Sequence, residues 1–133
     1  MSTIFAKIIR REIPAHIVAE DDKNIAFLDI NPVTPGHTLV LPKAEIAYLF
    51  DMDDSDYTAL HLFAKKVAIA LQNVFPDKRI GTAVVGLEVP HVHIHLIPFT
   101  RMSEFSFSNP KYKMGPDELA PLASKILETY QNL

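Results

Sequence analysis

The alternation of histidine and aliphatic residues in the segment 89–98 constrains the fold of this chain more than any other sequence feature. The segment reads Val-Pro-His-Val-His-Ile-His-Leu-Ile-Pro, so that His91, His93 and His95 occupy every second position. Because successive side chains of a β-strand point to opposite faces, the three imidazoles share one face and the aliphatic side chains share the other. The pattern predicts a strand over 91–98 with one face for packing and one for chemistry.

The remaining sequence predicts four more strands and three regular helices. Short apolar runs bounded by turn residues predict strands over 16–20, 25–29, 38–41 and 79–85. Apolar residues at helical spacing predict a helix that ends before Pro14, a helix from about 53 to 74 and a helix beginning at Pro116. One or two helical turns are expected over 44–50, and 101–114 reads as a lid or a crossing loop. The order favours a single α+β domain over 1–133, with a mostly antiparallel sheet of about five strands.

Composition excludes several classes of function. The net charge is −3 with neutral histidines, so no basic field is present to hold a nucleic-acid backbone, although a local cationic site can still bind a small anion. The absence of cysteine excludes disulfides, thiolate metal sites and a cysteine nucleophile. The start lacks the order of a secretory signal and no run of eighteen apolar residues occurs, so we expect a cytoplasmic protein with no membrane partner.

Two kinds of chemistry fit the aligned histidines. Strand residues four apart are separated by roughly 13 Å, whereas a metal–imidazole bond is about 2.1 Å, so His91 and His95 cannot share one ion. Two neighbours in the row, completed by His37 or Glu88, are compatible with a metal site. Alternatively, His93 attacks an electrophilic phosphorus through a neutral ring nitrogen while the flanking imidazoles stabilise charge on the phosphate oxygens.

The segment from His91 to Ile97 fits the pattern His-φ-His-φ-His-φ-φ, where φ is apolar, and resembles the motif of the histidine triad (HIT) family of nucleotide-binding proteins. Three further segments, Ile4–Pro14, Ala26–Ile30 and Gly36–Lys43, resemble the first half of the Hint-like branch in order and spacing. The long helix and the tail match only in general character. The resemblance covers most of the chain and implies a HIT-like fold and a homodimer.

The family resemblance also implies a mechanism and a set of site residues. His93 is the implied nucleophile that accepts a nucleotidyl group, and hydrolysis of this intermediate releases a nucleoside monophosphate without a metal or another cofactor. His95 and His37 then contact the α-phosphate region, while His91 orients the nucleophile, partly through its backbone. Asp29 accepts hydrogen bonds from the ribose hydroxyls. The residues implied to line the base pocket or contact the nucleotide are Ile4, Phe5, Ile8, Phe27, Ile30 and Val89. We expect a purine nucleotide substrate, with phosphoramidates and adenylates ahead of dinucleoside polyphosphates.

The chain departs from the family pattern just before the histidines. Many members carry Gly-Gln-Ser or Gly-Gln-Thr where this chain has Gly86, Leu87 and Glu88, and the usual upstream Asn is not evident in 80–85. A protonated Glu88 donates a proton to the leaving group, whereas an ionised Glu88 repels an anionic ligand unless it is paired with a histidine. The sequence therefore leaves two alternatives open: a nucleotide-binding signalling protein with little turnover, and a metalloenzyme that uses His93, His95 and His37.

Overall fold

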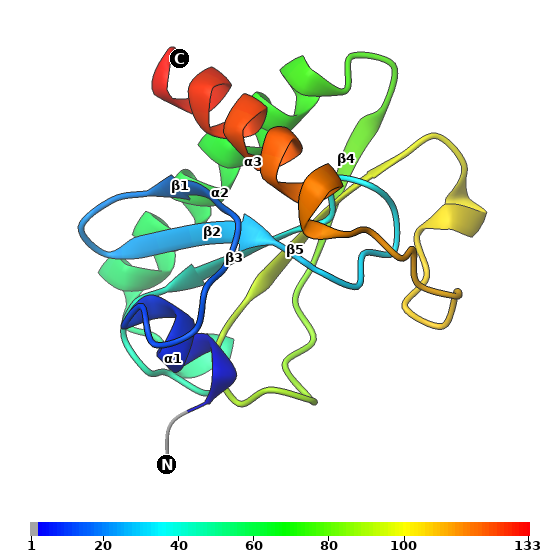
Figure 1. Ribbon diagram of the computed structural model, residues 1–133. Helices are drawn as coiled ribbons and strands as arrows, with labels where there is room; N and C mark the ends of the chain where they lie inside the picture. Colours follow the sequence, from blue (N-terminus) through cyan, green and yellow to red (C-terminus); the bar gives the residue numbers. More distant parts are fainter. Residues whose placement is uncertain (1–2) are drawn as a thin grey trace.

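Five antiparallel strands and three helices make up the computed structural model, which describes residues 3–133 (Figure 1). The helices are α1 (Ile4–Ile9), α2 (Asp54–Val74) and α3 (Pro116–Gln131), with 3₁₀ turns η1 (Leu49–Asp51) and η2 (Met102–Glu104). The strands are β1 (Ile17–Glu20), β2 (Asn24–Leu28), β3 (Thr38–Pro42), β4 (Arg79–Ala83) and β5 (Ile94–Phe99), in the spatial order β1-β2-β3-β5-β4. The predicted α+β class with a sheet of about five antiparallel strands is confirmed.

The central strand β3 and its neighbour β2 are buried at every residue. Before β2, the Asp21 carboxylate accepts hydrogen bonds from the backbone N–H groups of Lys23 and Asn24, at 2.9 and 2.8 Å. This local side-chain contact closes the turn between β1 and β2, as expected for an Asp at a hairpin corner. The predicted hairpin is thereby confirmed.

Helices cover both faces of the sheet, and the two faces have different sizes. On one face α2 and α3 bury a large core with residues of the sheet, among them Val40, Ile94 and Leu96. On the other face the short helix α1 places Phe5 and Ile8 over a smaller cluster with residues of β2 and β3 (Figure 1). His95 pairs directly with Leu39, a member of this smaller cluster, so its imidazole faces the α1 side. No helix among residues 3–133 has the length and apolar character required to cross a membrane.

The strand that carries the histidines begins later than the alternation predicts. It starts at Ile94, so the prediction of a strand from His91 was wrong at its amino-terminal end. Continuing the register of β3 and β5 places Pro42 opposite Val92, and proline has no N–H with which to extend the ladder. The Val92 N–H instead donates to the carbonyl of Ile46, at 2.8 Å. His91 and His93 therefore lie in an ordered loop at the entrance to β5.

Other predicted boundaries also moved, most of them by one or two residues. Strand β4 ends at Ala83 rather than at position 85, and α1 ends at Ile9. Between 44 and 50 the predicted helical turns reduce to η1, which begins at Leu49. Helix α2 agrees with the predicted range of about 53 to 74. It begins at Asp54 because the Asp53 carboxylate caps it by accepting from the Asp56 N–H at 2.9 Å.

Gly36 precedes β3 in a conformation that a side chain would strain, and its replacement tests the packing at this corner. Its φ is +93°, and a Cβ atom would lie 2.6 Å from the ring of Phe75. We expect Gly36→Ala to lower the free energy of unfolding by about 2–4 kcal/mol, through backbone strain and overpacking together. Urea denaturation followed by circular dichroism measures the loss.

Gly86 provides the matched control for this substitution. Its φ is +73°, but a Cβ atom there would meet no atom within 4 Å. Gly86→Ala should therefore cost only the backbone strain, about 1–2 kcal/mol. Equal losses in the two variants would show that the contact with Phe75 contributes nothing.

Candidate active site

The His93 side chain is held in one tautomer by a backbone carbonyl. Its Nδ1 lies 2.7 Å from the carbonyl oxygen of His91. Because a carbonyl oxygen only accepts, Nδ1 of a neutral His93 ring carries the proton and Nε2 carries the free lone pair. The Phe5 ring packs edge to face against the imidazole at a centroid distance of 4.9 Å and restricts its rotation. His93 therefore presents an unprotonated ring nitrogen, the form of imidazole that acts as a nucleophile.

A second chain of hydrogen bonds fixes the tautomers of His37 and His95. The Val33 N–H donates to Nδ1 of His37 at 3.0 Å, so the proton of a neutral His37 lies on Nε2. That Nε2 lies 2.9 Å from Nδ1 of His95 and donates to it. The proton of a neutral His95 consequently lies on its own Nε2. A backbone N–H thus sets, through two rings, which nitrogen of His95 can donate a hydrogen bond to a ligand.

His91 lies beneath the site rather than in it. Its side chain has no exposed surface, and its Nε2 donates to the carbonyl of Pro42 at 2.8 Å. Its Nδ1 is a buried atom with no hydrogen-bond partner in the described part of the chain, consistent with an unprotonated nitrogen. The ring anchors the loop before β5 to the end of β3, and this contact places the His91 carbonyl beside His93.

Burial favours the neutral form of three histidines, His37, His91 and His95. Desolvation is the main cause that lowers the pKa of His37 to about 3, and the charges of His95 and Lys111 lower it further. Desolvation, followed by the charge of His93, lowers the pKa of His95 to about 4. The pKa of His91 is also lowered by burial, against the opposing effect of its bond to Pro42. Near neutral pH these rings act as donors and acceptors of hydrogen bonds and carry no charge.

Asp29 contributes a carboxylate beside the histidines. Its Oδ1 accepts from the Asn31 N–H at 2.9 Å, and its Oδ2 lies 3.8 Å from Nε2 of His37. That longer contact is not an ion pair at neutral pH, because His37 is uncharged and its proton is directed at His95. Burial raises the pKa of Asp29, while the Asn31 N–H lowers it.

These side chains line one cavity of about 260 Å³. The cavity brings together five of the residues that the sequence selected: Asp29, His37, Glu88, His93 and His95. Its volume is close to the lower end of the range for small-molecule sites, about 300 Å³. The cavity therefore brings imidazole nitrogens and carboxylates together in a volume that suits a small ligand.

The other residues selected from the sequence do not line this cavity. Phe5, Ile8 and Phe27 belong to the buried cluster under α1. Ile4 and Ile30 are exposed, with 52% and 60% of their surface accessible. Val89 is partly buried and packs against the same cluster, and His91 supports the site from below.

Five cavity-lining residues were not selected as site residues from the sequence: Val85, Gly86, Leu87, Phe107 and Lys111. The first three belong to the loop before the histidines. Their sequence signal was the departure from the family pattern at Leu87. Phe107 and Lys111 come from the irregular segment 101–114, and the Phe107 ring packs 4.6 Å from the ring of His95. Their only sequence signal was an aromatic and a basic residue in a segment suspected to be a lid.

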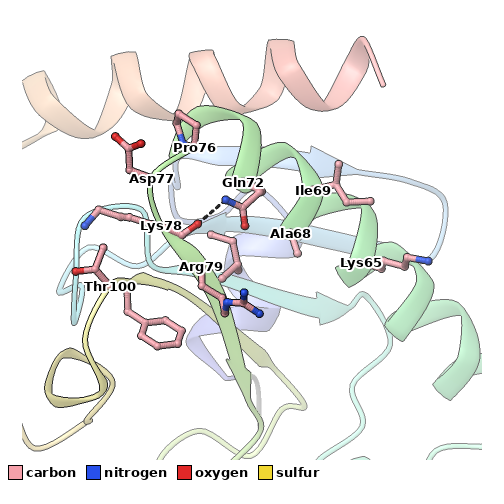
Figure 2. Close-up of a pocket in the computed structure, with 11 residues that line it drawn as sticks. Lys65, Ala68, Ile69, Gln72, Pro76, Asp77, Lys78, Arg79 and Thr100 are labelled. Atoms are coloured by element: carbon pink, nitrogen blue, oxygen red, sulfur yellow. Dashed lines mark hydrogen bonds between the residues drawn. The ribbon is translucent and has the colours of Figure 1, made fainter.

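A larger depression of about 770 Å³ lies elsewhere, between α2 and β4 (Figure 2). Its lining includes Lys65, Gln72, Lys78 and Arg79 but no histidine. The Gln72 amide donates to the carbonyl of Lys78 across it (Figure 2). Because its side chains provide no nucleophile with a fixed tautomer, we place the candidate active site in the smaller histidine cavity.

Comparison with known proteins identifies the family of the chain. A family model described as the HIT domain matches residues 10–102. An uncharacterized HIT-like protein of Borreliella burgdorferi is 41% identical over 111 residues, covering 78% of this chain and 80% of the relative. A protein of Schizosaccharomyces pombe named adenosine 5'-monophosphoramidase is 35% identical over 130 residues, covering 95% of this chain and 96% of the relative.

Solved structures agree along nearly the whole chain. A HIT-like protein from Bartonella henselae superposes with a TM-score of 0.83 at 34% identity, covering 96% of each chain. A histidine triad protein from Mycobacterium smegmatis, described as Zn-bound, superposes with a TM-score of 0.83 at 25% identity, covering 99% of this chain and 95% of the other. Given this agreement and the match over residues 10–102, the chain belongs to the HIT family.

Proposed function

We propose that this protein hydrolyses or transfers nucleotidyl groups at the α-phosphorus of purine nucleotide derivatives, through a covalent intermediate on His93. The observation that carries the proposal is the hydrogen bond of 2.7 Å from Nδ1 of His93 to the His91 carbonyl, which leaves Nε2 unprotonated in the histidine cavity. The name of the Schizosaccharomyces pombe relative supports phosphoramidates as the leading substrate class. Adenylates come next, followed by dinucleoside polyphosphates.

The covalent step balances with the groups present in the cavity. Nε2 of His93 forms a bond to the α-phosphorus, and the bond from phosphorus to the leaving group breaks with its electron pair on the leaving atom. The ring becomes cationic, which strengthens the donation from Nδ1 to the His91 carbonyl. Water then attacks phosphorus and gives up a proton to the Glu88 carboxylate, which lost its own proton to the leaving group in the first step. The bond to Nε2 breaks with its electron pair on nitrogen, and a nucleoside monophosphate leaves with His93 restored to its neutral form.

His95 and His37 supply neutral hydrogen-bond donors for this reaction. In the tautomers set by Val33, Nε2–H of His95 is free of the histidine chain and is available to a non-bridging phosphate oxygen. His37 orients His95 and shares the same cavity. Neutral donors suit a step in which charge on the phosphate oxygens is redistributed, because they require no change of protonation during the reaction.

The nucleoside would extend from the phosphate towards Asp29 and α1. A carboxylate accepts hydrogen bonds from a ribose diol, and among residues 3–133 Oδ2 of Asp29 has no partner closer than His37 at 3.8 Å. The family resemblance assigns the base contacts to an apolar set around α1, consisting of Ile4, Phe5, Ile8, Phe27, Ile30 and Val89. The exposed Ile4 and Ile30 are the members of this set that a base can reach without rearrangement of the buried cluster.

Glu88 is the candidate for proton delivery to the leaving group. Its side chain is exposed and lines the same cavity as His93. A carboxyl group at this rim can pass a proton to a departing amine, the leaving group of a phosphoramidate, without entering the buried histidine network. No metal or other cofactor is part of the proposal.

His93→Ala tests the covalent mechanism directly. Turnover of a labelled adenosine phosphoramidate should fall by about 10³-fold or more, because the nucleophile is removed. After an alkaline denaturing quench, the wild-type protein should retain label on His93, and acid should release it. His61→Ala, at an exposed histidine of α2, is the matched control and should keep wild-type turnover and circular dichroism.

Three results would contradict the proposed mechanism. Tight binding of nucleotide with neither adduct nor product would favour a signalling protein with little turnover. Turnover that survives in the His93 variant would remove the covalent mechanism. Turnover abolished by chelators and restored by stoichiometric metal would favour a metalloenzyme.

The depressed pKa values predict how stability depends on pH. The unfolded chain protonates His37 and His95 near pH 6.5, whereas the folded protein protonates them only near pH 3 and pH 4. Stability is therefore greatest above pH 6.5 and is lost as the pH falls toward 4. For the buried His37 the loss between pH 7 and pH 5 is about 2 kcal/mol, which urea denaturation measures.

The raised pKa of Asp29 makes the folded protein more stable as the pH falls, which opposes the effect of the histidines. The loss of stability on acidification should therefore be steeper in Asp29→Asn. Imidazole NMR signals identify the rings directly. Protonation of His37 or His95 above pH 6 in the folded protein would contradict the hydrogen-bond chain from Val33 through His37 to His95.

We also propose that the protein is a homodimer, joined near β4 and α2. Strand β4 lies at one edge of the sheet, where β5 is its only strand partner among residues 3–133. Helix α2 exposes Leu62 and Ile69, with 62% and 44% of their surface accessible, and Ile69 borders the depression in Figure 2. An open strand edge beside exposed apolar residues is a suitable surface for association.

The double substitution Leu62→Glu and Ile69→Glu should convert a dimer into a monomer, because charged side chains would oppose burial of this surface. Light scattering coupled to size exclusion measures the mass. Leu87→Glu, at an exposed leucine outside α2, is the control and should stay dimeric. A wild-type monomer would overturn the proposal.

A further inference from the structure

The histidine cavity contains very little positive charge for a site that binds a phosphate. Burial keeps His37 and His95 neutral near pH 7. Asp29 and Glu88 add carboxyl groups to the lining. Among the described residues, Lys111 is the only lysine or arginine that lines this cavity. An anionic ligand therefore depends on this one ammonium group for direct charge neutralisation.

Segment 101–114, which carries Lys111, is tied to the rest of the protein at two residues, Phe107 and Tyr112. The Phe107 ring packs against His95 at a centroid distance of 4.6 Å and lies 6.4 Å from the ring of His37. The Tyr112 N–H donates to the carbonyl of Pro32 at 2.9 Å, which ties the segment to the loop before β3. The Lys111 ammonium donates to the carbonyl of Asn109 at 3.0 Å and also to that of Phe107. Lys111 is thus held at the cavity by contacts on both sides of it.

The ammonium group retains one donor for a ligand. A lysine side chain carries three N–H bonds, and two of them are directed at the carbonyls of Phe107 and Asn109. Those carbonyls orient the group without neutralising its charge. Its charge reaches the interior of the site, where it lowers the pKa of both Asp29 and His37.

We propose that Lys111 is the anion-binding residue of the cavity and contacts the non-bridging oxygens of the α-phosphate. The inference rests on the proposed function and deepens it, because it assigns the recognition of phosphate charge to segment 101–114 rather than to the histidines. The histidines supply the nucleophile and neutral donors. Lys111 supplies the positive charge by which the site distinguishes a nucleotide from a nucleoside. The site then selects ligands with at least one negative charge at the α-phosphate and discriminates weakly among uncharged nucleosides.

Calorimetric titration with AMP and with adenosine tests this assignment without requiring turnover. Lys111→Gln should weaken AMP binding about tenfold, because one charge-assisted hydrogen bond is lost. Adenosine binding should change less than twofold, as it has no phosphate. Lys111→Arg keeps the charge and should restore AMP affinity to within about threefold of wild type. Added salt should weaken AMP binding more in the wild type than in Lys111→Gln, because salt screens an exposed charge.

Lys113→Gln is the matched control, since Lys113 is also exposed but does not line the cavity. It should bind AMP as the wild type does. Equal weakening of AMP and adenosine in Lys111→Gln would overturn the proposal and assign Lys111 a purely structural role in segment 101–114. Unchanged AMP affinity in that variant would overturn it as well.

The same measurements separate this inference from the proposed reaction. If a His93 adduct forms but Lys111→Gln binds AMP as tightly as the wild type, the anion-binding role is wrong and the proposed reaction stands. If AMP binding depends on Lys111 but no adduct or product forms, the reaction fails and the anion-binding role stands. Failure of the wild-type protein to bind AMP would overturn both.

Discussion

The hydrogen bond from Nδ1 of His93 to the carbonyl of His91 is the interaction on which the site depends. A carbonyl that only accepts selects one tautomer and leaves the reactive lone pair on Nε2. Contacts of His91 and its neighbour hold this carbonyl in position. The buried ring of His91 is bonded to the carbonyl of Pro42, and the Val92 N–H is bonded to that of Ile46. The end of the β3 ladder at Pro42 thus helps to determine the tautomer of His93, in the loop before β5.

Burial determines the second property of the site, its neutrality. Removing His37 and His95 from water lowers the pKa of each far below 7, so a proton on either ring serves as a hydrogen-bond donor and not as a charge. The tautomers can then be transmitted from Val33 through His37 to His95, because each neutral ring has one donor and one acceptor. Charging His37 would break this chain, since a doubly protonated imidazole cannot accept from the Val33 N–H. The positive charge that a bound anion needs must therefore come from a residue that is not part of this series of hydrogen bonds.

Sequence periodicity was sufficient for the parts of the fold that repeat. Apolar spacing located α2 and α3, and alternation located the core of β5 and the common direction of His93 and His95. The start of β5 could not be predicted, because it depends on a proline in another strand and becomes visible only once the β3 register is known.

The site was partly predictable for the same reason. The histidines and Asp29 come from elements with clear patterns or from the family motif, and they line one cavity. Phe107 and Lys111 come from a segment with no period, and only long-range contacts such as that of Tyr112 with Pro32 bring it to the cavity. The family resemblance implied a role for the His91 backbone beside His93, whereas the tautomers of His37 and His95 escaped prediction, since they depend on the Val33 N–H, whose position is set by tertiary structure.

The departures from the family pattern lie where they leave this hydrogen-bond network intact. Leu87 is 88% exposed and Glu88 is exposed, both at the rim of the cavity, whereas His37, His91 and His93 are buried. None of the hydrogen bonds that fix the tautomers involves position 87 or 88. In the reaction proposed above, substitution at the rim would change what the leaving group meets without changing His93 or the bonds that fix its tautomer. The rim and the buried histidines can therefore vary independently of each other.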